Sequence, residues 1–99
     1  MKHGGCTYLL TNKHHTVLYI GVTSDLYNRI KEHKEKADPK SFTARYNCDK
    51  LVWYECYSSI TEAIAFEKYY KGKTRAFKIN LINSLNPEWK DLWEEVKEW

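Results

Sequence analysis

The sequence predicts an α+β fold in which a three-stranded antiparallel β-sheet is flanked by α-helices. Three runs rich in β-branched and aromatic residues, at 6–11, 16–21 and 51–56, predict the strands. Segments with apolar residues at helical spacing lie between and after these runs. The chain has 99 residues, of which 42% are hydrophobic and 15% aromatic, so we expect one packed domain over residues 1–99.

The first two runs flank a polar tip, Asn12-Lys13-His14-His15, and are expected to form a β-hairpin. With a four-residue loop at the tip, Thr11 faces Thr16 and Tyr8 lies opposite Tyr19. Opposed residues of an antiparallel pair point to the same face of the sheet, so the two rings would be in contact. This prediction depends on register, because a one-residue slip would send the rings to opposite faces.

The next segment predicts a helix from about residue 25 to 36 that ends before Pro39. Thr23 or Ser24 can cap this helix, and the helix dipole favours Asp25 in its first turn. Its apolar residues recur at a spacing of four, which gives the helix one face that can pack on the sheet.

Leu26 and Ile30 form the inner stripe of this helix, and Arg29 and His33 lie at its border. A spacing of four residues puts Arg29 and His33 on one face, where the core meets solvent. A reactive pair of side chains would need that position. The alternative is an ordinary amphipathic helix with solvated charges, which we favour for these two residues taken alone.

The connection at 37–49 has mixed sequence signals. Within it, residues 42–46 predict either a short helical turn or a loop tied down by its aromatic side chains. The run at 51–56 then predicts the third strand, which we expect beside the hairpin.

A second long helix is expected from about residue 60 to 71. Ser59 followed by Glu62 is a capping-box pattern that opens it. On a helical wheel Glu67 lies on the face that ought to be buried. A carboxylate there is costly unless a cation meets it, which leaves two alternatives: a salt bridge to Arg29 or another base, or a metal ligand.

Gly72 is expected to end or interrupt this helix. It lies in a segment, residues 68–78, that combines five cations with three aromatic rings and has no acidic residue. Such a mixture suits contacts with the phosphates and bases of nucleic acid. The alternative is a solvated helix end, because cations are favourable near helix C-termini. The candidate nucleic-acid-binding residues are Lys68, Lys71, Lys73, Arg75 and Lys78.

Two further helical stripes are expected towards the end of the chain. The first covers residues 77–85, and Asn86-Pro87 then predicts a helix N-cap with proline at the first helical position. The second stripe indicates core packing and consists of Trp89, Leu92, Trp93 and Val96.

The cysteine count, the net charge and the lack of long apolar runs indicate the cellular location and the kind of partner. Cys6, Cys48 and Cys56 are an odd number without CxxC spacing, so we expect free, mostly buried thiols in a reducing cytoplasm, not a disulfide scaffold or a zinc site. The formal net charge of +3 permits nucleic acid as a partner without requiring it. No window has membrane-spanning length and no signal peptide is evident, so a cytoplasmic location without membrane association is expected.

These residues resemble the GIY-YIG nuclease superfamily. Tyr19-Ile20-Gly21 is the second motif of that superfamily letter for letter. Cys6-Thr7-Tyr8 stands in the place of the first motif, keeping the tyrosine but not the glycine and isoleucine. Arg29 and His33 have the spacing of the family's first helix, and Glu67 lies in a segment like the one that carries the family's metal-binding glutamate.

The segment 86–92 is similar to the closing part of the small stand-alone bacterial branch, which is close to the nuclease module of the excision-repair subunit UvrC. The resemblance implies divalent-metal-dependent hydrolysis of DNA phosphodiesters. Arg29 would hold the phosphate at two points, and Glu67 would hold Mg²⁺ or Mn²⁺. Tyr8 or Tyr19 would take a proton from the attacking water, its phenolate made more accessible by Arg29 and the metal ion.

His33 would orient a tyrosine or the phosphate, or shuttle the proton. Gly21 and Asn86 complete the candidate site as supporting residues, and for Asn86 a helix-capping role is the favoured alternative. We therefore expect a structure-selective or weakly specific DNA endonuclease linked to repair or recombination. It would be a monomer or weak homodimer whose protein partner supplies target choice. The alternatives are a non-catalytic DNA-binding adaptor and an interaction domain that uses its tryptophan-rich C-terminal helix.

Overall fold

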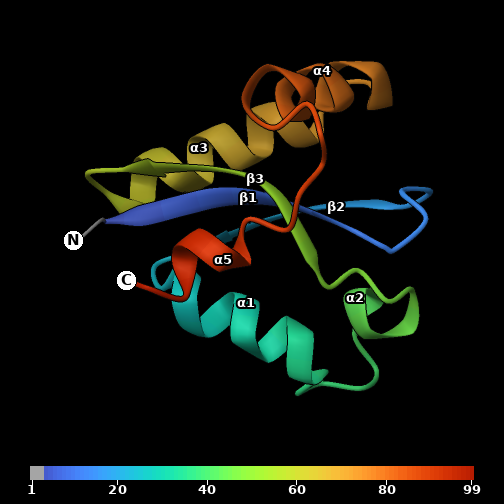
Figure 1. Cartoon of the computed structure of the whole chain (residues 1–99). Helices are drawn as coiled ribbons and strands as arrows, with labels where there is room; N and C mark the ends of the chain where they lie inside the picture. The colour runs from blue at the N-terminus through green and yellow to red at the C-terminus, as the bar shows by residue number, and fades with distance from the viewer. Residues whose placement is uncertain (1–3) are drawn as a thin grey trace.

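The computed structural model describes residues 4–99, which form three layers with the β-sheet in the middle (Figure 1). The sheet is antiparallel in the order β2-β1-β3. Its strands are β1 (Gly5–Thr11), β2 (Leu18–Thr23) and β3 (Lys50–Tyr57). The helices are α1 (Leu26–Glu35), α2 (Phe42–Arg45), α3 (Ile60–Lys71), α4 (Arg75–Leu85) and α5 (Trp93–Val96). The predicted fold class is confirmed; residues 1–3 of the predicted domain lie outside the described part.

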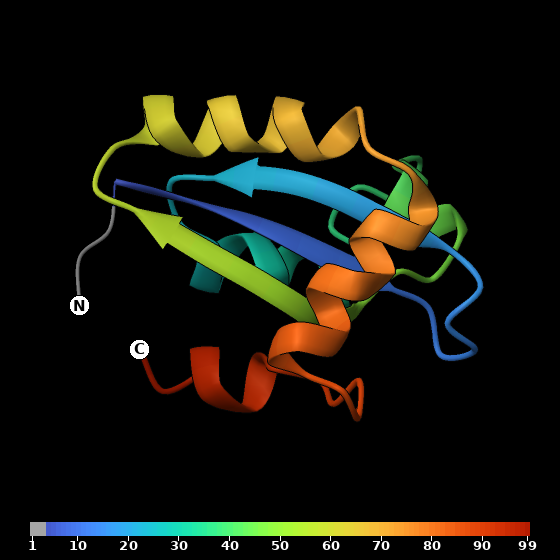
Figure 2. The same ribbon diagram turned by 90° about the horizontal axis from the view of Figure 1, so that it is seen from above.

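The helices are divided between the two faces of the sheet. α1 and α5 pack on one face with α2 beside them, and α3 and α4 cover the other (Figures 1 and 2). Because side chains alternate along a strand, β1 contributes to two cores. Tyr8 and Leu10 pack with Leu26 and Ile30 of α1, which confirms the predicted inner stripe of that helix. Leu9 packs on the opposite side, with residues of α3 and α4.

The hairpin register differs from the prediction by two residues. Tyr8 pairs with Gly21 and Leu10 with Tyr19, so the predicted pairing of Tyr8 with Tyr19 is wrong. The cause is Asn12, whose side-chain oxygen accepts hydrogen bonds from the backbone N–H groups of residues 16 and 17 and keeps them in the loop. A shift of two preserves the faces of a strand. The rings of Tyr8 and Tyr19 therefore still share a face, with centroids 6.4 Å apart.

The helix caps agree with the sequence in one case and differ in another. Ser59 caps α3 as predicted, and its hydroxyl accepts a hydrogen bond from the N–H of Glu62 at 3.1 Å. The cap of α1 is Asp25, not Thr23 or Ser24: the Asp25 carboxylate accepts from the backbone N–H at position 28. Thr23 instead accepts from the N–H of Asp25. Gly72 ends α3 as predicted.

The end of the chain is less helical than predicted. Asn86 is the C-cap of α4, not the N-cap of a new helix. Its side-chain amide donates to the carbonyl oxygens of Val52 and Lys90, which holds the following turn against β3. Trp89 then has a φ of 55°, which a continuing helix cannot accept. Helix resumes only at Trp93–Val96, so the predicted helix starting at Pro87 is wrong.

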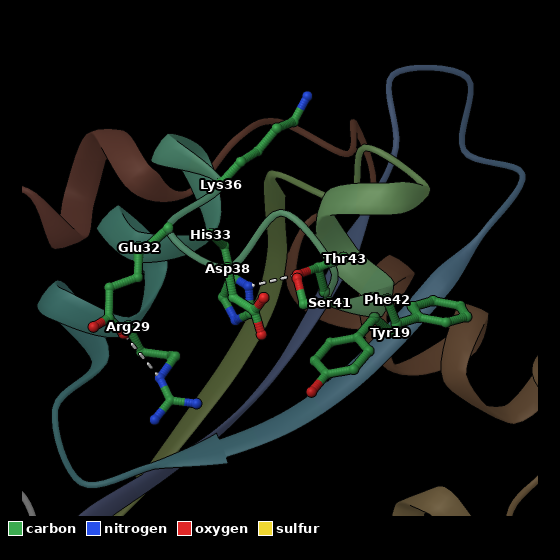
Figure 3. Close-up of a pocket in the computed structure, with 10 residues that line it drawn as sticks. Tyr19, Arg29, Glu32, His33, Lys36, Asp38, Ser41, Phe42 and Thr43 are labelled. Carbon is green, nitrogen blue, oxygen red and sulfur yellow. Dashed lines mark hydrogen bonds and ion pairs between the residues drawn. The ribbon is translucent and has the colours of Figure 1, made fainter.

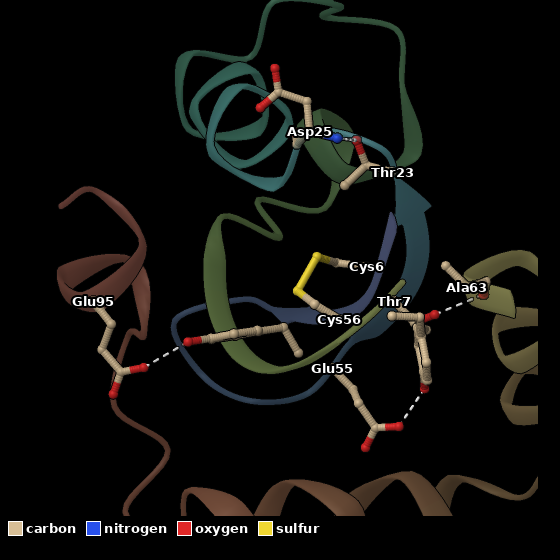
Figure 4. The surroundings of a disulfide bond; sticks show 10 residues. Cys6, Thr7, Thr23, Asp25, Glu55, Cys56, Ala63 and Glu95 are labelled. Carbon is tan, nitrogen blue, oxygen red and sulfur yellow. Dashed lines mark hydrogen bonds between the residues drawn. A yellow bond between two sulfur atoms is a disulfide. The ribbon is translucent and has the colours of Figure 1, made fainter. Parts of the chain in front are cut away.

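A disulfide joins β1 to β3, which overturns the prediction of free thiols at both positions (Figure 4). Cys6 lies directly opposite Cys56 in the antiparallel pair, with the two Cα atoms 4.0 Å apart. Cys48 is free and buried, as predicted. The cytoplasmic location rested partly on reduced thiols, loses that support and stays a prediction. Within residues 4–99, no helix has the length and apolar character needed to cross a membrane.

Candidate active site

A pocket of about 330 Å³ opens between α1, the α2 region and β2 (Figure 3). Three of the predicted site residues, Tyr19, Arg29 and His33, line this pocket. They come from β2 and from two successive turns of α1, as the sequence spacing predicts. The other lining residues are Glu32, Lys36, Ala37, Asp38, Ser41, Phe42 and Thr43.

His33 is held at both nitrogens of its ring. Nε2 lies 3.0 Å from the hydroxyl oxygen of Tyr8, and Nδ1 lies 2.9 Å from the hydroxyl oxygen of Thr43. Burial lowers the pKa of His33, and the charge of Arg29 lowers it further against the weaker opposite effect of Glu32. The imidazole is therefore neutral at neutral pH.

Tyr8 lies behind the pocket and is completely buried. Burial raises the pKa of its hydroxyl, and Tyr19 adds to the rise. Arg29 lowers the pKa by its charge and by a hydrogen bond to the hydroxyl, but this does not offset burial. Burial thus favours the protonated phenol of Tyr8, and the expected easier access to a phenolate, which invokes Arg29 together with a metal ion, stays a prediction.

Gly21 makes room for the Tyr8 ring. A Cβ atom at Gly21 would lie 2.5 Å from both Cζ and the hydroxyl oxygen of Tyr8. No side chain can therefore stand at Gly21 while Tyr8 crosses β2 towards His33. Gly21 of the second motif thus leaves the space that the Tyr8 ring of the first motif occupies.

Phe42 and Thr43 belong to the pocket but were missed at the sequence level. The Phe42 ring stacks on Tyr19 with a centroid distance of 5.9 Å and an interplanar angle of 27°, and 47% of Phe42 is exposed. Thr43 is buried and bonds His33. The one available signal was the prediction that residues 42–46 form either a short helical turn or a loop tied down by its aromatic side chains.

Arg29 is an exposed cation that lines the pocket. Its side chain is 47% exposed, and its Nε lies 3.3 Å from a carboxylate oxygen of Glu32, one turn along α1. An exposed pair of this kind contributes little stability. The guanidinium can therefore exchange Glu32 for another anion at small cost.

Glu67 lies apart from this pocket. It belongs to α3, on the face of the sheet opposite α1, and it does not line the pocket. Its side chain is only 15% exposed, and its ion partner within residues 4–99 is Lys71, at 4.0 Å. Of the predicted salt bridge to Arg29 or another base, the second form is present: Glu67 pairs with Lys71, while Arg29 pairs with Glu32.

A divalent cation is compatible with Glu67. Its carboxylate is mostly buried and only distantly neutralised, so it has acceptor capacity to offer. The described residues contain no cluster of three or more His, Cys, Asp or Glu side chains that could enclose a metal ion. A single carboxylate suits Mg²⁺, which keeps most of its waters and takes its remaining ligands from substrate phosphates.

The basic segment spans the end of α3 and the start of α4. The Lys73 ammonium lies over two rings, 4.4 Å from the centroid of Tyr69 and 5.5 Å from that of Phe77. Arg75 donates a hydrogen bond to the carbonyl oxygen of His15 and so ties the segment to the hairpin tip. Lys68 and Lys71 are exposed, whereas Lys78 is half-buried. Asn86 lies outside the pocket and has the structural contacts given above.

Comparison with known proteins bears on this arrangement. The model of the GIY-YIG catalytic domain matches residues 4–80. The chain belongs to the GIY-YIG family. A UPF0213 protein of Clostridium perfringens (strain 13 / Type A) is 39% identical to it over 67 residues, which cover 68% of this chain and 71% of the relative. No solved structure matches the chain.

Membership in the GIY-YIG family identifies a nuclease superfamily, whose substrate is DNA and whose members generally use divalent metal ions. The matched range includes all five residues predicted to be catalytic, from Tyr8 to Glu67. Asn86 lies beyond the matched range.

Proposed function

We propose that this GIY-YIG domain is a divalent-metal-dependent endonuclease that hydrolyses DNA phosphodiester bonds. The observation that supports this most is the convergence of Tyr19, Arg29 and His33 on one pocket (Figure 3). The transition state of phosphodiester hydrolysis concentrates negative charge on oxygen. A site stabilises it by placing a cation and hydrogen-bonding groups in position before the reaction.

In this proposal Arg29 binds the phosphate. Its guanidinium can contact two phosphate oxygens at once, after release from its exposed pair with Glu32. A tyrosine takes the proton of the attacking water. Tyr19 lines the pocket and can meet that water directly, whereas Tyr8 is buried and takes part through His33 and Arg29.

Glu67 would hold Mg²⁺ or Mn²⁺, which when bound would neutralise charge on the phosphate and the leaving oxygen. β2 is an edge strand of the sheet, and α3 packs against it (Figure 2). Tyr19 of β2 lines the pocket on the other face. We propose that the DNA strand crosses this edge. It would then reach Arg29 on one side of β2 and Glu67 on the other.

The exposed lysines beyond Glu67 would extend the contact along the DNA backbone. One catalytic centre cuts one strand, so a monomer or weak homodimer would suffice for nicking. Selectivity for branched or flapped DNA, a role in repair or recombination, and a protein partner that supplies target choice are part of the same proposal.

The proposal is tested by incubating the protein and Mg²⁺ or Mn²⁺ with nicked, flapped and branched DNA. Arg29→Gln should lower the cleavage rate by about 1,000-fold, the loss expected for a group that stabilises transition-state charge. Lys31→Gln is the matched control, because Lys31 is an exposed cation on the same helix that does not line the pocket. Absence of cleavage by the parent protein on every DNA with either ion would refute the proposal.

A second candidate function is a DNA-binding adaptor that recruits another DNA-processing protein. The separation of Glu67 from the pocket favours it, because binding alone does not need the two to meet. An adaptor would bind DNA without cutting it. Lys71→Ala should then reduce the slope of log affinity against log salt by about 1, while Tyr19→Phe leaves binding unchanged.

A further inference from the structure

We propose that Thr43 is a positioning residue that sets the direction of a buried hydrogen-bond chain. The chain runs from Thr43 through His33 to Tyr8, whose hydroxyl interacts with the charge of Arg29. The proposal rests on the proposed function only for the role of Arg29 as phosphate ligand. The hydrogen-bond chain itself is a property of the folded protein and can be tested without DNA.

The first step concerns the hydroxyl of Tyr8. Tyr8 is completely buried and keeps its proton, so its O–H group needs an acceptor inside the protein. Arg29, whose charge lowers the pKa of this hydroxyl, has N–H donors and no acceptor to offer. The acceptor within reach is Nε2 of His33, at 3.0 Å. Tyr8 therefore donates to His33.

The second step follows for the imidazole. Since Nε2 accepts from Tyr8, the neutral ring carries its single proton on Nδ1. Nδ1 then donates to the hydroxyl oxygen of Thr43, at 2.9 Å. The opposite tautomer would aim an N–H at the Tyr8 oxygen, leaving the O–H of Tyr8 without this acceptor. In the described chain no buried side-chain nitrogen or oxygen lacks a hydrogen-bond partner.

Thr43 is fixed in place by the start of α2. Ser41 caps this helix by accepting a hydrogen bond from the N–H of Ala44 at 3.2 Å, and its hydroxyl lies 3.3 Å from that of Thr43. Thr43 itself is only 4% exposed. The acceptor offered to His33 is therefore a rigid one, from an element separate from α1.

The consequence reaches the phosphate ligand. Each of the two bonds of the chain has a set direction: Tyr8 donates to His33, and His33 donates to the oxygen that Thr43 supplies. Without that oxygen the imidazole can take the Nε2–H form, which turns the phenol O–H of Tyr8 away from His33. The Tyr8 oxygen then accepts from Nε2–H, which uses part of its acceptor capacity and changes the polar group that Arg29 faces.

The test is the tautomer of His33, read by ¹⁵N NMR of histidine-labelled protein at pH 8. The parent protein should show a protonated Nδ1 and an unprotonated Nε2. Thr43→Ser keeps the hydroxyl and should keep that pattern. Thr43→Val, of similar shape, should shift His33 towards the Nε2–H form. An Nε2–H form in the parent would overturn the proposal, and so would an unchanged Nδ1–H form in a folded Thr43→Val protein.

Cleavage assays separate this inference from the proposed function. Thr43→Val should lower the rate of DNA cleavage by about 10-fold, as expected when the hydrogen-bond partner that orients a functional histidine is removed. Thr43→Ser should retain most of the parental rate. A cleavage-competent parent whose Thr43→Val variant cuts at the parental rate would overturn the positioning role. If the parent cuts no DNA, the proposed function fails, and the NMR result still decides the hydrogen-bond chain.

Discussion

The two faces of the sheet present their polar groups in opposite ways. On the α1 face, hydrogen bonds of 2.9–3.0 Å link His33 to Tyr8 and Thr43. Tyr8 and Thr43 are buried, and His33 is half-buried. On the α3 face, Glu67 is mostly buried and has an ion partner only at 4.0 Å. The α1 face is organised by its own residues before any ligand arrives. On the α3 face, the ion partner of the Glu67 carboxylate among residues 4–99 is the distant Lys71, which leaves the carboxylate available to the cation proposed above.

The largest effect is expected from removing the charge of Glu67 on the α3 face. Glu67→Gln should lower metal-dependent cleavage by about 1,000-fold, because the carboxylate would be the only protein ligand proposed for the ion. The melting temperature should stay the same or rise, since a buried charge is removed. DNA cleavage and thermal unfolding measure the two quantities.

Lys71→Gln is the matched control for Glu67. It removes the distant ion partner but leaves the carboxylate, so cleavage should fall far less than in Glu67→Gln. Equal cleavage by the parent and Glu67→Gln would remove the metal-binding role from the α3 face.

A second prediction concerns the α1 face, where Gly21 makes room for Tyr8. Gly21→Ala would place a Cβ atom 2.5 Å from the ring and hydroxyl of Tyr8, so either β2 or Tyr8 must move. We expect a loss of about 1–3 kcal/mol in the free energy of unfolding, together with reduced cleavage because Tyr8 leaves His33. Denaturant unfolding measures the first effect.

Gly72→Ala is the matched control for Gly21. A Cβ atom there would lie 3.6 Å from its nearest neighbour, and the φ of −79° is accessible to any residue. Its unfolding free energy should change by less than about 1 kcal/mol. If Gly21→Ala proves as stable as Gly72→Ala, the packing of Tyr8 across β2 does not require a glycine at position 21.

The sequence correctly predicted which side chains lie together on the α1 face, although the hairpin register that it predicted was wrong. The register was wrong by two residues, yet Tyr8 and Tyr19 share a face because strands repeat every two residues. Arg29 and His33 share a pocket because helix spacing depends on local geometry alone.

What the sequence did not predict depends on contacts between distant elements. Thr43 reaches His33 only because α2 packs beside α1, and nothing in the residues 37–49 fixes that placement. The disulfide needs the register of β1 against β3, which includes an irregularity between Leu9 and Leu10. Asn86 caps α4 in place of a new helix because its amide finds Val52 on β3.

The smallest expected effect is a shift in the titration of His33. Its pKa in the folded protein lies below the ordinary value of about 6.5, so the neutral ring and its bonds persist to below pH 6.5. As pH falls below 6.5, the unfolded chain takes up the proton first, and this residue lowers stability until pH passes the folded pKa. Cleavage that needs the neutral ring should likewise decline only below pH 6.5.

Glu32 makes this pH dependence testable. The carboxylate of Glu32 raises the pKa of His33, against the stronger effects of burial and of Arg29. Glu32→Gln should therefore move the NMR titration midpoint of His33 to lower pH, while Glu35→Gln, an exposed change on the same helix, should leave it in place. A midpoint that moves to higher pH in Glu32→Gln would mean that the mutation reorganises the face. The claim that its own residues fix it before any ligand binds would then fail.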